Sequence, residues 1–148
     1  MARLKIPPMA PASADEMESQ FYDALQHADI ERLMAVWADD DDIVCVHPGG
    51  SRLFGREAIR GSFERMFERG PVNAHPEQVR RMQSPSCAVH SVLERVDVQA
   101  PGGPQHAWVV ATNIYIETAL GWRLASHHAS PGAPGVDTDF VETSSVLH

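Results

Sequence analysis

Two histidine-bearing segments contain the side chains best suited to chemistry in this sequence. His47 ends an apolar run that starts at Ile43, and His127 and His128 follow the strand-like segment Trp122-Arg-Leu-Ala-Ser126. The ordinary pKa of histidine is about 6.5, so an imidazole beside an apolar core can give or take a proton near neutral pH. Such a group can remove a proton from a carbon next to a carbonyl or stabilise an oxyanion. The sequence therefore predicts a pocket served by histidine acid–base chemistry.

The first part of the chain predicts three amphipathic helices that would form one wall of this pocket. Ser13 and Glu16 have the spacing of a capping box, which starts the first helix. Asp29 caps a second helix that ends at Trp37, and the third helix is expected over residues 55–70. Apolar residues recur at helical spacing in each segment, so each helix buries one face.

The rest of the chain predicts strands, because the apolar pattern changes to a period of two. Strands are expected over residues 43–47, 78–83, 87–99, 105–117 and 122–130. Helices followed by long antiparallel strands indicate an α+β domain, with the helices on one face of a meander. Long strands twist and curl, so the concave face of this sheet and the helices would enclose a cone.

The turn at the last hairpin determines which side chains face the helices. If Gly121 is a left-handed bulge residue, Glu117 lies opposite Arg123. This register places one apolar set toward the helices: Trp108, Val110, Thr112, Ile114, Ile116, Trp122, Leu124, Ser126 and His128.

The alternating set, with Asn113, Tyr115 and His127, is then expected on the opposite face. A bulge in either strand would exchange the two sets, and strongly curved sheets bend by bulging. We therefore rank His128 above His127 as the pocket histidine.

We expect His47, His128 and Asp40 to supply the acid–base groups. Seven further side chains are expected to bind the substrate: Trp37, Phe54, Phe63, Phe67, Trp108, Thr112 and Ser126. Aromatic rings with a few hydroxyls suit an apolar or aromatic molecule that carries a carbonyl or hydroxyl group. A structural role competes in each case, because strand-end histidines are often simply hydrogen-bonded and aromatic residues fill cores. The aspartates 39–42 are most simply the solvated end of a helix.

Composition excludes several other classes of protein. The net charge of −8 over 148 residues argues against a nucleic-acid surface. No apolar run is long enough for a membrane span or a signal peptide, so we expect a cytoplasmic protein. Cys45 and Cys87 are expected to be reduced. No cofactor fingerprint is present, and a shared metal site would need a bulge to bring His127 and His128 to one face.

Four segments together resemble the SnoaL-like branch of the nuclear transport factor 2 and ketosteroid isomerase superfamily. They are Phe21-Tyr-Asp-Ala-Leu25, residues 29–47, Gly55-Arg-Glu-Ala-Ile59 and residues 121–131. The resemblance implies a cone of three helices on a strongly curved, mostly antiparallel sheet, and a homodimer formed through the sheet. We accordingly expect an N-terminal extension (1–12), a SnoaL-like domain (13–131) and a C-terminal tail (132–148).

The resemblance does not extend to steroid isomerisation. The steroid isomerases combine an aspartate base with an oxyanion hole made of a tyrosine and a protonated aspartic acid. Tyr22 has the position of a matching tyrosine, but the late strands offer Thr112, Asn113 and Ser126 where a carboxylic acid is needed.

Three functions stay open from the sequence. The first is a cofactor-independent isomerase, hydratase or cyclase that acts on an apolar or aromatic carbonyl compound. The second is a non-catalytic ligand-binding or dimerisation domain, and the third is a metal-assisted enzyme.

Overall fold

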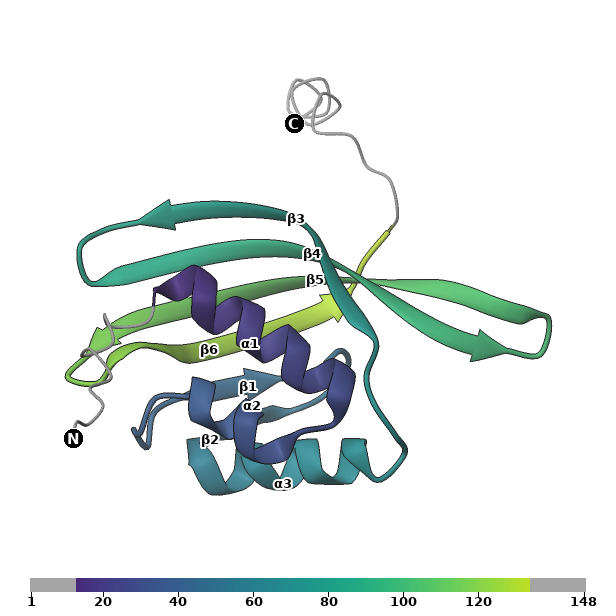
Figure 1. The fold of residues 1–148 in the computed structure, drawn as a ribbon, viewed down its shortest axis with the longest axis horizontal. Coiled ribbons are helices and arrows are strands. Elements are labelled where there is room, and N and C mark those ends of the chain that lie inside the picture. The colour runs from purple at the N-terminus through teal and green to yellow at the C-terminus, as the bar shows by residue number, and fades with distance from the viewer. Residues whose placement is uncertain (1–12, 134–148) are drawn as a thin grey trace, which may run out of the picture.

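The computed structural model describes residues 13–133 and confirms the α+β architecture, with three helices on one face of a curved, unclosed sheet (Figure 1). The helices are α1 (Ala14–His27), α2 (Ile30–Val36) and α3 (Gly55–Phe67). The strands are β1 (Val44–Val46), β2 (Arg52–Phe54), β3 (Ala74–Gln83), β4 (Cys87–Ala100), β5 (Gly103–Thr118) and β6 (Gly121–Pro131). The expected N-terminal extension and nearly all of the C-terminal tail lie outside the described residues.

The helix starts follow the predicted capping chemistry. The Ser13 hydroxyl accepts a hydrogen bond from the Glu16 amide at 3.1 Å, and the Glu16 carboxylate accepts one from the Ser13 amide at 2.8 Å. Asp29 caps α2 through the Arg32 amide at 3.1 Å. None of the helices within residues 13–133 is both long and apolar enough to cross a membrane.

The sheet has the order β2-β1-β6-β5-β4-β3, and its neighbouring strands are antiparallel except for the parallel pair β1 and β6. The short strand β2 and the first part of β3 were not predicted. The end of the β4–β5 hairpin extends beyond both neighbouring strands (Figure 1), because β3 first pairs at Val96 and β6 pairs only as far as Val109.

The predicted register of the β5–β6 hairpin is wrong, because the turn is one residue tighter than expected. Thr118 pairs with Gly121, so Glu117 lies opposite Trp122, and the expected partner Arg123 lies opposite Ile116. The Thr118 side chain stabilises this turn. Its hydroxyl donates to the Gly121 carbonyl at 2.7 Å and accepts from the Leu120 amide at 3.1 Å.

A second change of register follows at Ala125, the extra residue between the pairs Tyr115–Leu124 and Ile114–Ser126. The bulge reverses the faces of the last part of β6. The tighter turn places Asn113 and Tyr115 of β5 on the helix face, and the bulge returns His127 of β6 to that face, so all three residues expected on the opposite face are buried. Four residues expected in the pocket lie on the outer face of the sheet: Trp108, Thr112, Ser126 and His128.

The apolar core lies between the helices and this inner face. Phe21 of α1, Leu33 of α2 and Ile59 of α3 are completely buried, together with Leu124 of β6. Each helix therefore buries its predicted stripe, and the sheet face that they cover contributes the remaining core side chains.

Candidate functional site

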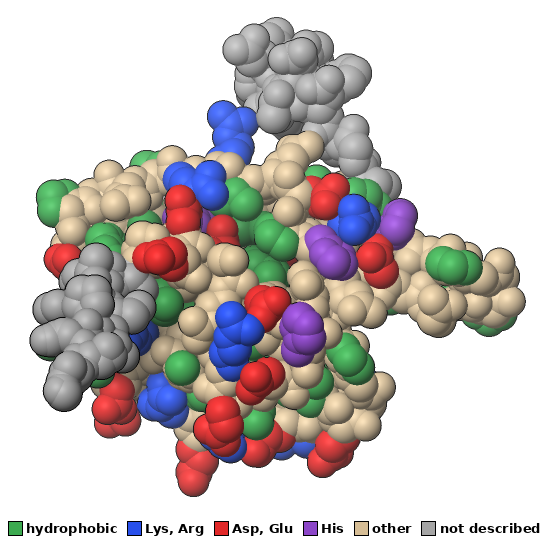
Figure 2. Space-filling view, in the orientation of Figure 1, with side chains coloured by type: hydrophobic (Ala, Val, Ile, Leu, Met, Phe, Trp, Pro, Cys, Tyr) green, Lys and Arg blue, Asp and Glu red, His purple; other side chains and the backbone are tan. Residues whose placement is uncertain are grey.

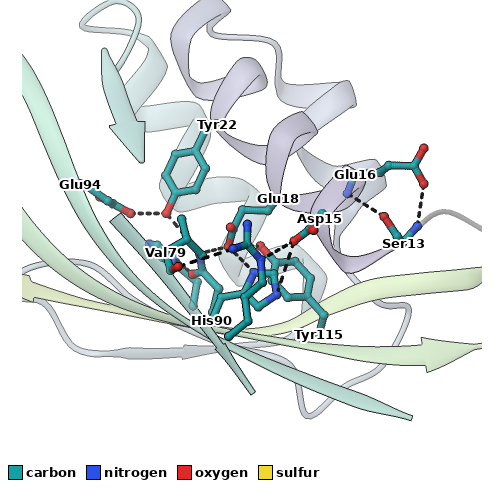
Figure 3. Close-up of polar contacts among 12 residues, drawn as sticks. Ser13, Asp15, Glu16, Glu18, Tyr22, Val79, His90, Glu94 and Tyr115 are labelled. Carbon is teal, nitrogen blue, oxygen red and sulfur yellow. Dashed lines mark hydrogen bonds and ion pairs between the residues drawn. The ribbon is translucent and has the colours of Figure 1, made fainter. Parts of the chain in front are cut away.

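Seven buried polar side chains gather between α1 and the sheet. We call them the interior polar cluster: Glu18, Tyr22, His90, Glu94, Asn113, Tyr115 and His127. All are at most 5% exposed, and Figure 3 shows how the α1 and β4 members approach one another beneath the helix. Such a density of polar groups is unusual for a core and makes this cluster the candidate site.

Among the hydrogen bonds that carboxyl groups of the cluster accept, the one between Tyr22 and Glu94 is the shortest. The Tyr22 hydroxyl donates to Glu94 Oε2 at 2.6 Å, across from α1 to β4. Asn113 of β5 donates through Nδ2 to the Tyr22 oxygen at 3.1 Å. The phenol is thus held between an amide donor and a carboxyl acceptor.

Glu18 is the second carboxyl group of the cluster, one helical turn before Tyr22. Its Oε2 accepts hydrogen bonds from Tyr115 at 3.0 Å and from Asn113 at 3.2 Å. The Nδ1 atom of His90 lies 2.9 Å from the same oxygen but is out of line for a hydrogen bond (Figure 3). Glu18 therefore links three completely buried side chains of β4 and β5 to α1.

His127 extends the network to β6. Its Nδ1 lies 2.6 Å from Asn113 Oδ1, and the ring packs against Phe21 with centroids 5.0 Å apart. Burial, assisted by the charges of His47 and His128, lowers the pKa of His127 to about 3, so its imidazole is neutral at pH 7. Because Asn113 Oδ1 is an acceptor, Nδ1 holds the proton and Nε2 keeps a free lone pair.

The pKa of Glu94 makes the cluster a competent proton donor and acceptor. Burial raises this pKa from 4.5 to about 7; the hydrogen bond from Tyr22 opposes the rise and the negative charge of Glu18 adds to it. Burial also raises the pKa of Tyr22 and Tyr115 well above 10, so both phenols remain protonated donors. A carboxyl that titrates near pH 7 beside a phenol donor suits general acid–base catalysis.

His47, the first predicted catalytic residue, lies on the inner face of β1 but outside the cluster. Its Nε2 lies 3.0 Å from the Ser62 hydroxyl, which itself donates to the Ile59 carbonyl, so the imidazole donates to Ser62. Its ring packs edge-on against Phe63. Burial and the charge of Arg65 lower the pKa of His47. The neighbouring thiol of Cys45 is inert, because burial raises its pKa to about 12.

The other predicted site residues are dispersed. Phe63 is part of the core and Phe67 packs against it, whereas Phe54 is 51% exposed. Trp37 and Asp40 line a separate open cleft of about 590 Å³ beside α2 and the β5–β6 turn. There Asp40 accepts a hydrogen bond from the Asp42 amide at 2.8 Å, as the solvated-terminus explanation expects. The structure thus does not bring Asp40 or His128 together with His47.

Sequence reasoning missed Glu18 and Glu94 as site residues. Signals for them were present. Glu18 and Tyr22 are four residues apart and so share a helix face with the apolar stripe, and His90 and Glu94 fall on the buried parity of β4. Within residues 13–133, no group of three or more His, Cys, Asp or Glu side chains is placed to hold a metal ion.

A fold of three helices on a curved sheet, with a polar interior between them, defines the class of proteins that resemble nuclear transport factor 2. The model of the SnoaL-like domain family matches residues 15–134, so the chain belongs to this family. The comparison with curated proteins finds no match. The resemblance noted in the sequence is confirmed, and the fold is one found in ligand-binding and isomerase- or dehydratase-type proteins.

Solved structures include relatives of two kinds. A Thiobacillus denitrificans protein, provisionally described as a calcium/calmodulin-dependent protein kinase type II association domain, is 31% identical, with a TM-score of 0.75 over 85% of this chain and 99% of that one. A Streptomyces avermitilis protein, provisionally described as a dehydratase of the NTF2-like family, is 27% identical, with a TM-score of 0.73 over 82% and 95%.

Proposed function

We propose that this protein binds a small carbonyl compound at the interior polar cluster and transfers protons to and from it. Glu94 takes or gives the proton at carbon, and the Tyr22 hydroxyl turns from Glu94 to the ligand oxygen and stabilises the developing oxyanion. The observation that carries the proposal is the 2.6 Å hydrogen bond between Tyr22 and a buried carboxyl group whose pKa is about 7. This chemistry is of the isomerase or dehydratase type.

The energetic cost of the cluster supports a functional role. Buried carboxyl groups lose hydration, and replacing buried ionic groups by apolar ones of similar size is often neutral or stabilising by about 1–4 kcal/mol. Glu18 and Glu94 are 4% and 5% exposed, yet an apolar core would serve stability as well. Perturbed titratable groups that are retained at such a cost are characteristic of active sites.

Access to the cluster is proposed at the edge where α1 meets β3. Glu94 lies opposite Pro76 of this edge strand and is 5% exposed. Nearby, α1 is tied to β3 by a hydrogen bond of 2.7 Å from the Gln26 side chain to the Ala74 carbonyl. The expected roles of His128 and Asp40 are replaced in this proposal by Glu94 and Tyr22, while His47 is kept as a polar group of the interior.

Proton exchange into a simple ketone tests the proposal. In D2O at neutral pD, we expect the protein to accelerate deuterium incorporation next to the carbonyl of 2-tetralone above the buffer rate, as followed by proton NMR. Tyr22→Phe is expected to lower this rate by about 10²- to 10³-fold, the usual effect of losing one oxyanion donor. Glu94→Gln is expected to lower it as strongly.

Glu68→Gln is the matched control for Glu94→Gln, because it removes an exposed carboxylate at the end of α3. This variant is expected to exchange at the wild-type rate. Exchange that proceeds equally well in Tyr22→Phe would exclude the proposed site.

A second function, self-association through the outer face of the sheet, is favoured by a separate observation. All three helices lie on the inner face (Figure 1), and this helix side carries many charged side chains (Figure 2). The outer face instead presents an apolar group from β4 and β5: Val89, Leu93, Trp108, Val110 and Ile114. An uncovered apolar sheet face favours a protein partner, and we propose a second copy, as in the association domain to which the chain is similar.

Val110→Asp is expected to convert the proposed dimer into a monomer, because Val110 is 42% exposed and a charge there would be buried on association. Light scattering coupled to size-exclusion chromatography measures the mass directly. Leu120→Asp is the matched control, since Leu120 is 75% exposed at the tip of the β5–β6 turn and should leave the mass unchanged. A wild-type protein that is monomeric at micromolar concentration would rule out the dimer.

A further inference from the structure

The charges of the interior polar cluster point to the class of molecule that it accepts. Resting on the proposed function, we propose that the site selects an uncharged or cationic ligand with hydrogen-bond donors and rejects carboxylates and phosphates. Neither the fold nor the relatives described above specify this selectivity.

The buried carboxyl groups of the described residues have no buried lysine or arginine beside them, and His90 is the nearest basic side chain to Glu18. Among residues 13–133, the buried polar side chains include Glu18 and Glu94 but no lysine or arginine. The negative charge of Glu18 already disfavours ionisation of its neighbours, because it raises the pKa of both Glu94 and Tyr115. An anionic ligand would add a further negative charge at low dielectric, with no buried lysine or arginine among these residues to offset it.

Two arginines near the interior do not supply that cation. Arg81 has a side chain that is 46% exposed, and its Nε pairs with Asp15 at 2.7 Å. Arg65, whose charge acts on His47, is exposed on α3. The first arginine is neutralised at the surface and the second is in solvent.

The hydrogen-bond inventory indicates that the ligand supplies donors. The protons of Tyr22, Tyr115 and Asn113 are all given to cluster members, and His127 gives its Nδ1 proton to Asn113. Five cluster atoms have no hydrogen bond among the described residues: Nε2 of His127, the second carboxylate oxygens of Glu18 and Glu94, and both ring nitrogens of His90. A neutral His90 ring has one donor and one acceptor nitrogen, so four of the five atoms are acceptors when Glu94 is ionised, and amino, amidine or hydroxyl groups complement them.

Three probes of nearly the same shape distinguish the effect of ligand charge from that of ligand shape. They are benzamidine (cationic), benzamide (neutral) and benzoate (anionic). Each is titrated into the ¹⁵N-labelled full chain at pH 8 and about 0.15 M salt, where surface charges are well screened. The Asn113 side-chain amide reports binding within the cluster. We expect benzamidine and benzamide to shift it, with benzoate weaker by at least about tenfold, the equivalent of one pKa unit.

Two variants exclude a general attraction of benzamidine to an acidic protein. Glu94→Gln is expected to remove the preference for benzamidine over benzamide, whereas Glu68→Gln changes the net charge equally and should leave it intact. Benzoate that shifts Asn113 as readily as benzamidine would overturn the inferred selectivity alone. Absence of any shift with all three probes also overturns it, and the proposed function then stands or falls separately on the Tyr22-dependent exchange of 2-tetralone.

Discussion

Replacing Glu18 by alanine is expected to lower the free energy of unfolding by about 3 to 6 kcal/mol, a large part of the 5–15 kcal/mol typical of a domain. The carboxylate accepts from Asn113 and Tyr115, and His90 Nδ1 lies 2.9 Å from it. All three partners are completely buried. Tyr115 would be left without an acceptor, Asn113 would keep only its bond to Tyr22, and the His90 ring would lose its nearest carboxylate; each such loss costs about 1–3 kcal/mol. Urea unfolding monitored by circular dichroism measures the loss.

Two further variants show whether the loss of stability comes from the Glu18 carboxylate itself. Ser19→Ala changes the neighbouring, exposed position of the same helix and is expected to alter stability by no more than about 0.5 kcal/mol. Glu18→Gln keeps the size of the side chain and one acceptor oxygen. Its loss of stability should lie between those of Glu18→Ala and Ser19→Ala. A Glu18→Ala protein as stable as Ser19→Ala would show that the cluster relaxes around the loss and does not connect α1 rigidly to the sheet.

Helix positions and fold class follow closely from the sequence because they depend on local chemistry. The Ser13 and Glu16 capping pair and the Asp29 cap act within one turn of chain, and both were predicted correctly. The alternation of apolar residues in β4 and β5 is likewise local. These features do not depend on how distant segments meet.

The predicted inner face of β6 was wrong because it depends on the number of residues in the turn and in any bulge along the hairpin. One residue in the turn and one at Ala125 decide which side chains point inward, and no local pattern marks either position. The apolar content of both faces made the alternatives difficult to distinguish. Ile114 points outward, whereas Ala111 and Tyr115 point inward.

Strand alternation gives the adjacent histidines separate surroundings, and the bulge at Ala125 makes His127 the inner one. His127 joins the interior through Asn113, while His128, paired with Thr112, lies exposed on the outer face. The proposed chemistry and the proposed self-association therefore use opposite faces of the same two strands. A variant of either face can be tested for one property with the other as its internal control.

Glu94→Gln is expected to change the pH dependence of stability strongly. The pKa of Glu94 is about 7 in the folded protein, against an ordinary value of 4.5. Between these values the unfolded chain releases the proton while the folded chain keeps it, so this group's contribution falls as pH rises from about 4.5 to 7. The total is about 3 kcal/mol. Glutamine does not titrate, so above pH 7 the free energy of unfolding of the variant is expected to exceed that of the wild type by this amount.

His127 changes the stability with pH in the opposite direction. Its pKa falls from 6.5 to about 3 on folding, so its contribution is complete above pH 6.5 and is lost as pH falls and the unfolded chain takes up the proton. Between about pH 4.5 and 6.5 the two slopes offset each other in the wild type. Glu94→Gln leaves the histidine slope unopposed, and its stability is expected to fall by about 3 kcal/mol from pH 6.5 to 4.5. Urea midpoints measured across that interval decide the matter, since parallel curves for variant and wild type would mean that Glu94 ionises normally in the folded protein.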